Sequence, residues 1–182
     1  MRIHEITDDV DYNKVYRGFN RAEMGSRPAG DDGRGHYIRT FGANKDKDPI
    51  AYKKGSSAYG PTQLNKTTAK DYTTRHKDLF KGQEEYAKKF DQQGANFNKF
   101  GREPNRAGYD KKWDYGGAGD LSDTKYHDQY KTFNKSVMKG MMRDLKKKNP
   151  NASVDDLVKR WRGAGKDQDP EYFDRFYQGY NK

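Results

Sequence analysis

The chain has 182 residues, enough for one domain, and its hydrophobic content of 31% with a mean hydropathy of −1.41 favours a small core within long polar loops. Aromatic residues make up 14% of the chain, and each ring can bury a large area, so a core built from rings is feasible. The net charge of +10 attracts polyanions such as nucleic acid, an anionic cell wall or acidic lipid, and the lack of cysteine excludes disulfides and thiolate metal sites.

The N-terminal residues contain no apolar segment of the kind that a secretory signal peptide needs, and no later stretch approaches a membrane span. We therefore expect a protein that is made in the cytoplasm without a signal peptide of its own. No internal repeat or low-complexity tail divides the chain. Residues 1–182 are predicted to form a single domain.

The first predicted helix covers residues 11–24, and Asp8 or Asp9 is positioned to cap its N-terminus. Its apolar side chains, spaced for one buried face, are Val15, Phe19 and Ala22. Glu23 falls in the last turn, where the negative end of the helix dipole raises the pKa of a carboxylate. Because surface helices seldom place glutamate at that end, the position indicates a functional use.

Residues 28–57 form a long polar connection, and a connection of this length in a compact domain is usually functional or disordered. Within it, residues 36–41 alternate in a way that is compatible with a short strand or β-ribbon. Residues 55–64 follow with the sequence Gly-Ser-Ser-Ala-Tyr-Gly-Pro-Thr-Gln-Leu. Since proline suits the first turn of a helix, we expect a loop-to-helix junction there, with Tyr59 and Gln63 on its two sides.

The rest of the chain is dominated by helical patterns. The remaining predicted helices are residues 61 to about 80 with a break near 75–76, residues 83–100, the longest from Ser122 to before Pro150, one from Ser153 to before Gly163, and one opened by Asp169 and Pro170. In the longest helix, the apolar residues that recur at steps of three and four are Tyr126, Tyr130, Phe133, Val137, Met141 and Leu145. We expect this helix to be the buried centre of the domain.

The segment Ser-Ala-Tyr-Gly-Pro-Thr-Gln at residues 57–63 resembles a loop of the lysozyme-like superfamily. In that superfamily, goose-type lysozymes and lytic transglycosylases carry Tyr-Gly-Leu-Met-Gln or Ser-x-x-Gly-x-x-Gln downstream of a catalytic glutamate. Glu-Met-Gly-Ser at residues 23–26 and Tyr-Ile-Arg-Thr at residues 37–40, followed by this segment, also resemble cell-wall-degrading enzymes of bacteriophages. The chain departs from the family pattern at Met24, where serine is usual, and at residues 160–165, where Arg-Trp-Arg-Gly-Ala-Gly lacks the asparagine of the family's late Ala-Tyr-Asn-Ala-Gly motif.

The resemblance implies a mainly α domain of the α+β lysozyme-like kind, with a helical bundle around a central buried helix and a small β-ribbon or extended segment. It implies an enzyme without cofactor or metal that cuts the MurNAc–GlcNAc β-1,4 bonds of bacterial peptidoglycan. Glu23 would be its general acid and base, because a carboxyl with a raised pKa can protonate the leaving glycosidic oxygen. The residues expected to bind substrate are Ser57, Tyr59, Gln63 and Trp161. The enzyme would be a phage lysis protein or a virion component, reaching the periplasmic cell wall after release or from the virion.

Two questions about the reaction stay open. Hydrolysis by inversion needs a second carboxylate to hold water, whereas transglycosylation onto the substrate's own hydroxyl needs none. The aspartates between Glu23 and the loop are Asp31, Asp32, Asp46 and Asp48, and none of them is assigned.

Glu23 is alternatively a surface glutamate that pairs with an arginine, and Trp161 is alternatively a core residue rather than a stacking wall.

Two other functions compete with the enzyme. A net charge of +10 with interleaved tyrosines, and lysine runs such as residues 146–148, suit a basic nucleic-acid-binding protein. A lysozyme-like fold without activity would suit a virion structural protein. The four histidines are scattered without the spacing of metal ligands, so no metal site is predicted.

Overall fold

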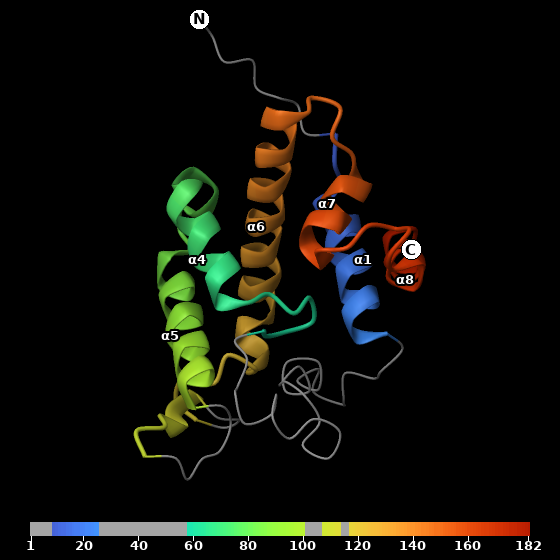
Figure 1. Cartoon of the computed structure of the whole chain (residues 1–182). Helices are drawn as coiled ribbons and strands as arrows, with labels where there is room; N and C mark the ends of the chain where they lie inside the picture. The colour runs from blue at the N-terminus through green and yellow to red at the C-terminus, as the bar shows by residue number, and fades with distance from the viewer. Residues whose placement is uncertain (1–8, 26–57, 101–106, 114–116) are drawn as a thin grey trace, which may run out of the picture.

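The computed structural model describes residues 9–25, 58–100, 107–113 and 117–182. The α-helices are α1 (Tyr12–Met24), α4 (Lys66–Arg75), α5 (Glu84–Phe100), α6 (His127–Lys148), α7 (Val154–Arg162) and α8 (Pro170–Tyr180) (Figure 1). Short 3-10 helices cover Lys77–Phe80, Lys111–Trp113 and Thr124–Tyr126. The prediction of a mainly α fold is therefore confirmed, and the described residues contain no strand. The strand or β-ribbon predicted at residues 36–41 lies outside the described residues.

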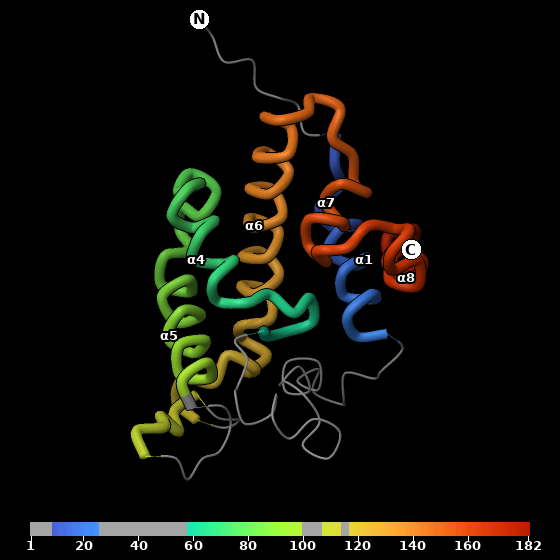
Figure 2. Tube along the Cα trace, viewed as in Figure 1, coloured from blue at the N-terminus to red at the C-terminus, as the bar shows by residue number. Residues whose placement is uncertain are grey.

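Helix α6 runs through the middle of the fold, with α4 and α5 on one side and α1, α7 and α8 on the other (Figure 2). The predicted apolar stripe is largely confirmed. Its buried members are Tyr130, Phe133, Val137 and Met141, and its half-buried members are Tyr126 and Leu145. Because the stripe contacts helices on both sides, α6 is the central helix that the sequence predicts.

The predicted starts of α7 and α8 are confirmed, and caps explain them, whereas α6 begins at His127 and not at the predicted Ser122, because a 3-10 turn capped by Asp123 precedes it. Ser153 and Asp156 form a reciprocal capping box at the start of α7, and Asp169 caps α8 with Pro170 in the first turn. The prediction that Asp8 or Asp9 caps the first helix was wrong, because the side chain of Asp11 accepts from the backbone N–H groups of the first turn. The cap is therefore the residue immediately before the helix.

Helices α1 and α8 pack closely because small residues stand at their contact. An added Cβ at Gly18 would lie 2.5 Å from the ring of Phe176, and one at Gly179 would lie 2.4 Å from the carbonyl oxygen of Arg17. Helix α1 buries Val15 and Phe19 completely, as predicted. The close approach brings the first turn of α8 alongside the last turn of α1, where Glu23 lies.

The loop before α4 differs from the sequence prediction. Pro61 does not begin a helix, because residues 60–63 form a turn that is closed by an antiparallel bridge between Tyr59 and Leu64. Helix α4 begins only at Lys66, where Asn65 caps it. The predicted break near residues 75–76 is confirmed, since α4 ends at Arg75.

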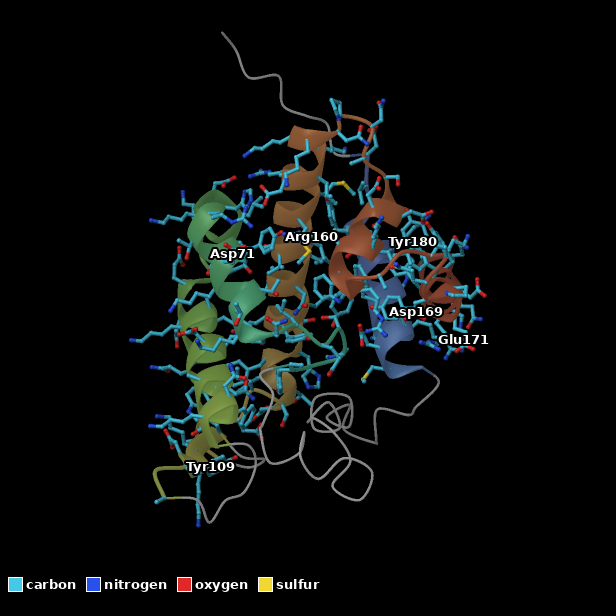
Figure 3. The ribbon with its side chains drawn as sticks, viewed as in Figure 1. Asp71, Tyr109, Arg160, Asp169, Glu171 and Tyr180 are labelled. Carbon is cyan, nitrogen blue, oxygen red and sulfur yellow. The ribbon has the colours of Figure 1, made fainter. Side chains whose placement is uncertain are left out.

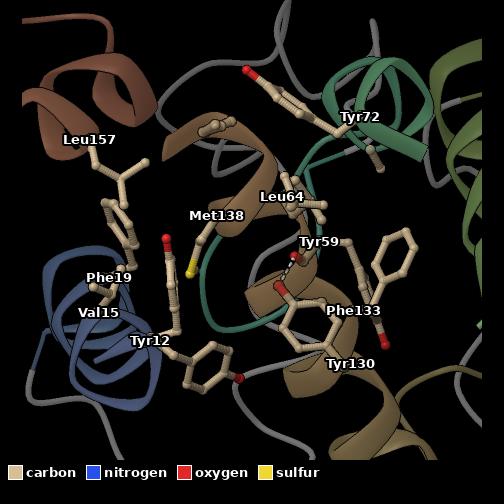
Figure 4. Close-up of a cluster of buried hydrophobic side chains, with 14 of the residues drawn as sticks. Tyr12, Val15, Phe19, Tyr59, Leu64, Tyr72, Tyr130, Phe133, Met138 and Leu157 are labelled. Atoms are coloured by element: carbon tan, nitrogen blue, oxygen red, sulfur yellow. Dashed lines mark hydrogen bonds between the residues drawn. The ribbon is translucent and has the colours of Figure 1, made fainter. Parts of the chain in front are cut away.

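Hydrogen bonds with side chains of α6 explain why residues 60–63 form a turn instead of the predicted first turn of a helix. The Tyr130 hydroxyl donates to the carbonyl oxygen of Tyr59 at 2.5 Å, drawn as a dashed line in Figure 4. The hydroxyl of Thr62 donates to Asn134 Oδ1 at 2.5 Å. Gly60 has a φ of 74° and an added Cβ would meet the Tyr130 ring at 2.1 Å, so glycine is required there. These contacts to α6 fix the loop in a non-helical conformation.

Candidate functional site

Glu23 lies in the last turn of α1 and is half-buried against the start of α8. The hydroxyl of Tyr172 donates a hydrogen bond of 2.6 Å to Oε1 of Glu23. Tyr172 is itself buried, and its backbone N–H is bound by the capping side chain of Asp169. The cap of α8 therefore fixes the position of the phenol that holds the Glu23 carboxyl.

Burial raises the pKa of Glu23, because removal from water disfavours the charged carboxylate. The hydrogen bond from Tyr172 and the positive charges of Arg162 and Arg175 act in the opposite direction but do not cancel the effect of burial. The sequence predicts the same direction from the helix dipole. The main physical cause in the structure is instead the burial of the carboxyl.

The arginines near Glu23 are engaged elsewhere. Arg162 donates from Nε to Asp169 at 2.9 Å, and its guanidinium lies 5.3 Å from the centre of the Tyr172 ring. Arg175 donates from Nε to the carbonyl oxygen of Ala22 at 3.3 Å. Among the described residues, no cation lies within ion-pair distance of Glu23. The alternative of a surface glutamate paired with arginine finds no partner in this part of the chain.

Trp161 contacts a residue close to Glu23 and also lines a groove. Its ring stacks on Phe19 with 4.6 Å between centroids and 25° between planes. Phe19 precedes Glu23 by four residues on α1, so the two side chains lie one helical turn apart on the same face. Trp161 is only half-buried and lines the groove, so it belongs to both the core and the groove wall.

The groove has a volume of about 300 Å³ and lies between α4 and α7, over α6. The residues that line it include Gln63, Asn65, Tyr72, Met141, Arg160 and Trp161. The described structure thus brings two of the predicted substrate-binding residues, Gln63 and Trp161, to one groove. Gln63 has a φ of 55° and donates from Nε2 to the carbonyl oxygen of Gly60 at 3.0 Å, which presents its amide at the end of the turn.

Tyr59 does not share this position. Its side chain is 2% exposed, and its ring meets Tyr130 and Phe90 edge-on at 5.8 and 6.1 Å between centroids. The ring therefore packs in the core, against Tyr130 and Phe90. It is too buried to contact a sugar. Ser57, the remaining predicted substrate-binding residue, lies outside the described residues, as do Asp31, Asp32, Asp46 and Asp48.

Sequence reasoning missed Tyr172 and Arg160. Tyr172 reads as one of several rings on the last helix, and no spacing connects it to Glu23. Arg160 sits among alternating basic and aromatic residues at the end of α7, and only the packing of α7 beside α4 assigns it to the groove. The available sequence signal was the capping pair Asp169-Pro170, which fixes where α8 begins.

The described residues contain no group of three or more potential metal ligands, and none of their helices is long and apolar enough to cross a membrane. The chain matches no protein-family model, no curated protein and no solved structure.

Proposed function

We propose that the chain is a peptidoglycan glycosidase in which Glu23 is the general acid and base at the MurNAc–GlcNAc β-1,4 bond. The observation that carries the proposal is the environment of Glu23: a half-buried carboxyl with a raised pKa, bound by the hydroxyl of Tyr172. A general acid needs such a carboxyl, because it must hold its proton close to the working pH.

The geometry suits a two-step reaction. Tyr172 donates to Oε1, which leaves Oε2 of Glu23 to carry the proton. In the first step that proton passes to the glycosidic oxygen as its bond to the anomeric carbon breaks, and positive charge develops on the sugar ring. In the second step the Glu23 carboxylate accepts a proton from the hydroxyl that attacks the anomeric carbon. The attacking group is water in hydrolysis, or the substrate's own 6-hydroxyl in transglycosylation.

The groove supports the proposal because it provides contacts for a saccharide, and Trp161 on its wall stacks on Phe19, one helical turn from Glu23. Trp161 offers a half-exposed ring, and Gln63 offers an amide that can bond to hydroxyl or N-acetyl groups. The net charge of +10 would speed the approach to an anionic wall. From the motif resemblance, we assign the enzyme to a bacteriophage, as a lysis protein or a virion component.

Of the two reactions, we propose transglycosylation. Among the described carboxylates, Asp169 is the one whose charge raises the pKa of Glu23, but it is bound to Arg162 and caps α8. It is therefore not available to activate water. The anhydro product of transglycosylation is lighter by one water than the hydrolysed product, so the two reactions are distinguishable by mass.

The experiment is digestion of purified peptidoglycan, followed by mass spectrometry of the soluble products. We expect 1,6-anhydro ends. If all reducing ends are hydrated, the enzyme is a lysozyme, and Asp31, Asp32, Asp46 and Asp48 are the positions to substitute in turn. If no glycan product forms, the enzyme proposal is wrong, and a salt-dependent shift of DNA would then support the nucleic-acid-binding alternative.

A further inference from the structure

Three lysines form a positive stripe along α6. Lys131, Lys135 and Lys139 follow one another at intervals of four residues, so their side chains share one face of the helix at steps of about 6 Å along its axis. Lys131 and Lys139 are exposed, and Lys135 is half-buried. Within the described part of the chain, no carboxylate lies within ion-pair distance of any of them. These three residues are the lysine stripe.

The charges of the lysine stripe repel one another. Partial burial lowers the pKa of Lys135, and the positive charges of Lys131 and Lys139 lower it further. Asp11 acts in the opposite direction with a smaller effect, and its carboxylate caps α1. Like charges at this spacing destabilise a helix, so the stability of α6 does not explain the stripe. A bound anion would relieve the repulsion.

Residues of α1 position two of the lysines without neutralising them. Lys135 donates from Nζ to Oδ1 of Asn13 at 3.2 Å. Nζ of Lys139 lies 5.5 Å from the centre of the Tyr12 ring. Because an amide and a phenol ring carry no charge, both ammonium groups remain available to an anion, and each has N–H donors left to bind it.

The lysine stripe lies on a different face of α6 from the groove. Lys139 and Met141, which lines the groove, are two residues apart, so their side chains point about 160° apart around the helix axis. Arg160, another residue of the groove, is labelled in Figure 3. Asn13, beside the stripe, precedes Glu23 on α1 by about 15 Å of helix axis. A ligand on the stripe would therefore leave the groove and Glu23 open.

The chemistry of the lysine stripe fits the phosphates of a DNA duplex. Ammonium groups bind phosphate as point charges, which gives affinity without sequence preference. Lys131 and Lys139 are separated by about 12 Å along the helix axis, close to the width of the major groove of B-DNA, so the stripe can reach phosphates on both of its sides. A single strand also needs rings on which its bases stack. Tyr12, the ring beside the stripe, is buried, with the ammonium group of Lys139 over its face.

We propose that the lysine stripe on α6 binds the phosphate backbone of double-stranded DNA without preference for sequence. This function is separate from the proposed glycosidase and uses none of its residues. The net charge of +10 supports it, since a positive field draws a polyanion to the surface before the stripe binds it. The protein would then bind DNA and glycan at the same time.

The test is the binding of a fluorescent duplex of mixed sequence, followed by anisotropy as salt rises from about 50 to 200 mM. Each phosphate that a lysine neutralises contributes about 0.9 to the slope of log affinity against log salt. Substitution of Lys131, Lys135 and Lys139 by glutamine should therefore reduce that slope by about 2.7. The double variant Lys131→Gln/Lys139→Gln keeps the bond from Lys135 to Asn13, and it should reduce the slope by about 1.8 even if the triple variant does not fold.

Substitution of Lys70, Lys77 and Lys81 by glutamine is the matched control. These lysines are exposed, form no ion pair with a described residue, and lie on α4 and just after it, on the other side of α6 from α1. The control has the same net charge as the triple variant of the stripe, but it should keep the wild-type slope. Equal losses of slope in the two triple variants, or no binding of the duplex by the wild type, would overturn the proposal.

Other polyanions and the glycosidase assay complete the test. A single DNA strand, a poly(glycerol phosphate) chain and phosphatidylglycerol vesicles should bind more weakly than the duplex at equal phosphate concentration, and tighter binding of any of them would overturn the assignment to duplex DNA. The duplex should leave cleavage of a short neutral oligosaccharide unchanged, whereas inhibition would place the DNA at the groove instead. A protein that binds the duplex through the stripe but cuts no glycan would contradict only the proposed function.

Discussion

The hydroxyl of Tyr172 binds Oε1 of Glu23 at 2.6 Å, although the two residues are 149 positions apart in the chain. This contact joins the last turn of α1 to the first turn of α8 and closes one side of the Glu23 carboxyl to water. The same burial that raises the pKa of Glu23 makes the ionised form costly in the folded protein. Catalysis and stability therefore depend on the same group in opposite ways.

The first prediction follows from that burial. A carboxyl whose folded pKa lies above its unfolded value stabilises the fold below the unfolded pKa, and this stability is lost as pH rises through the folded pKa. The pKa of Glu23 is raised from 4.5, so the wild type should lose stability relative to Glu23→Gln as pH rises from below that value. Thermal unfolding of both proteins from pH 4 to 8 checks this.

Glu85→Gln is the control for that series. Glu85 is exposed on α5, and its bond to Lys89 lowers its pKa, so the sign is reversed. Any stability from this pair is present above the unfolded pKa and lost as pH falls, which makes Glu85→Gln slightly less stable than the wild type at neutral pH only. If Glu23→Gln followed the same trend as Glu85→Gln, the assigned burial of Glu23 would be wrong.

The second prediction concerns Tyr172→Phe. The phenol stabilises the ionised form of Glu23 by donating to it, so its removal should raise the pKa of Glu23 further. The alkaline limb of the pH–activity profile should move to higher pH. The maximum rate should also fall, because the carboxyl is no longer held. An alkaline limb that stays in place or moves to lower pH would show that Glu23 is not the group that titrates.

The third prediction concerns the contact that holds the loop against α6. Gly60→Ala should destabilise the protein by more than about 2 kcal/mol, because its Cβ would lie 2.1 Å from the Tyr130 ring and its φ is 74°. Gly82→Ala is the control: its φ is 80°, but an added Cβ meets nothing within 4 Å. Chemical denaturation of both variants measures the difference, and equal costs would show that the contact with α6 does not hold the loop.

The fourth prediction concerns the net charge of +10. Lysis of intact cell walls should fall as salt rises, because screening shortens the reach of the field to about 8 Å at physiological ionic strength. Cleavage of a short neutral oligosaccharide should hardly change over the same range. Equal salt dependence on the two substrates would show that the charge does not serve the approach to the wall.

Much of the fold follows from local sequence signals. The stripe on α6, the capping box at Ser153 and the pair Asp169-Pro170 each predict an element from neighbouring residues, and each prediction is confirmed. The helix predicted from Pro61 fails for a non-local reason. Tyr130, on a helix 68 residues from Thr62, bonds to the loop and holds it in a turn, and no local pattern announces that contact.

In the candidate site, too, the sequence predicts individual residues, whereas the contacts between them depend on packing. Glu23 was predicted from its place at a helix end, but Tyr172, the residue that binds its carboxyl, lies on α8 at the other end of the chain. Gln63 and Trp161 were predicted separately from motifs, and their common groove depends on how α4 and α7 pack beside α6. Tyr59 has the motif position of a binding residue, yet the bridge to Leu64 turns its ring into the core. Motifs indicate residue types, whereas packing decides which side chains meet.

The most direct test of the account is lysis of purified peptidoglycan by Glu23→Gln, with Glu85→Gln as the matched control. Both variants should give the wild-type circular dichroism spectrum and a cooperative unfolding transition. We expect Glu23→Gln to lose at least about 100-fold in the rate of turbidity clearance, the scale that general-acid catalysis contributes, and Glu85→Gln to keep the wild-type rate. Clearance by folded Glu23→Gln at close to the wild-type rate would contradict the central claim that Glu23 is the acid and base of this protein.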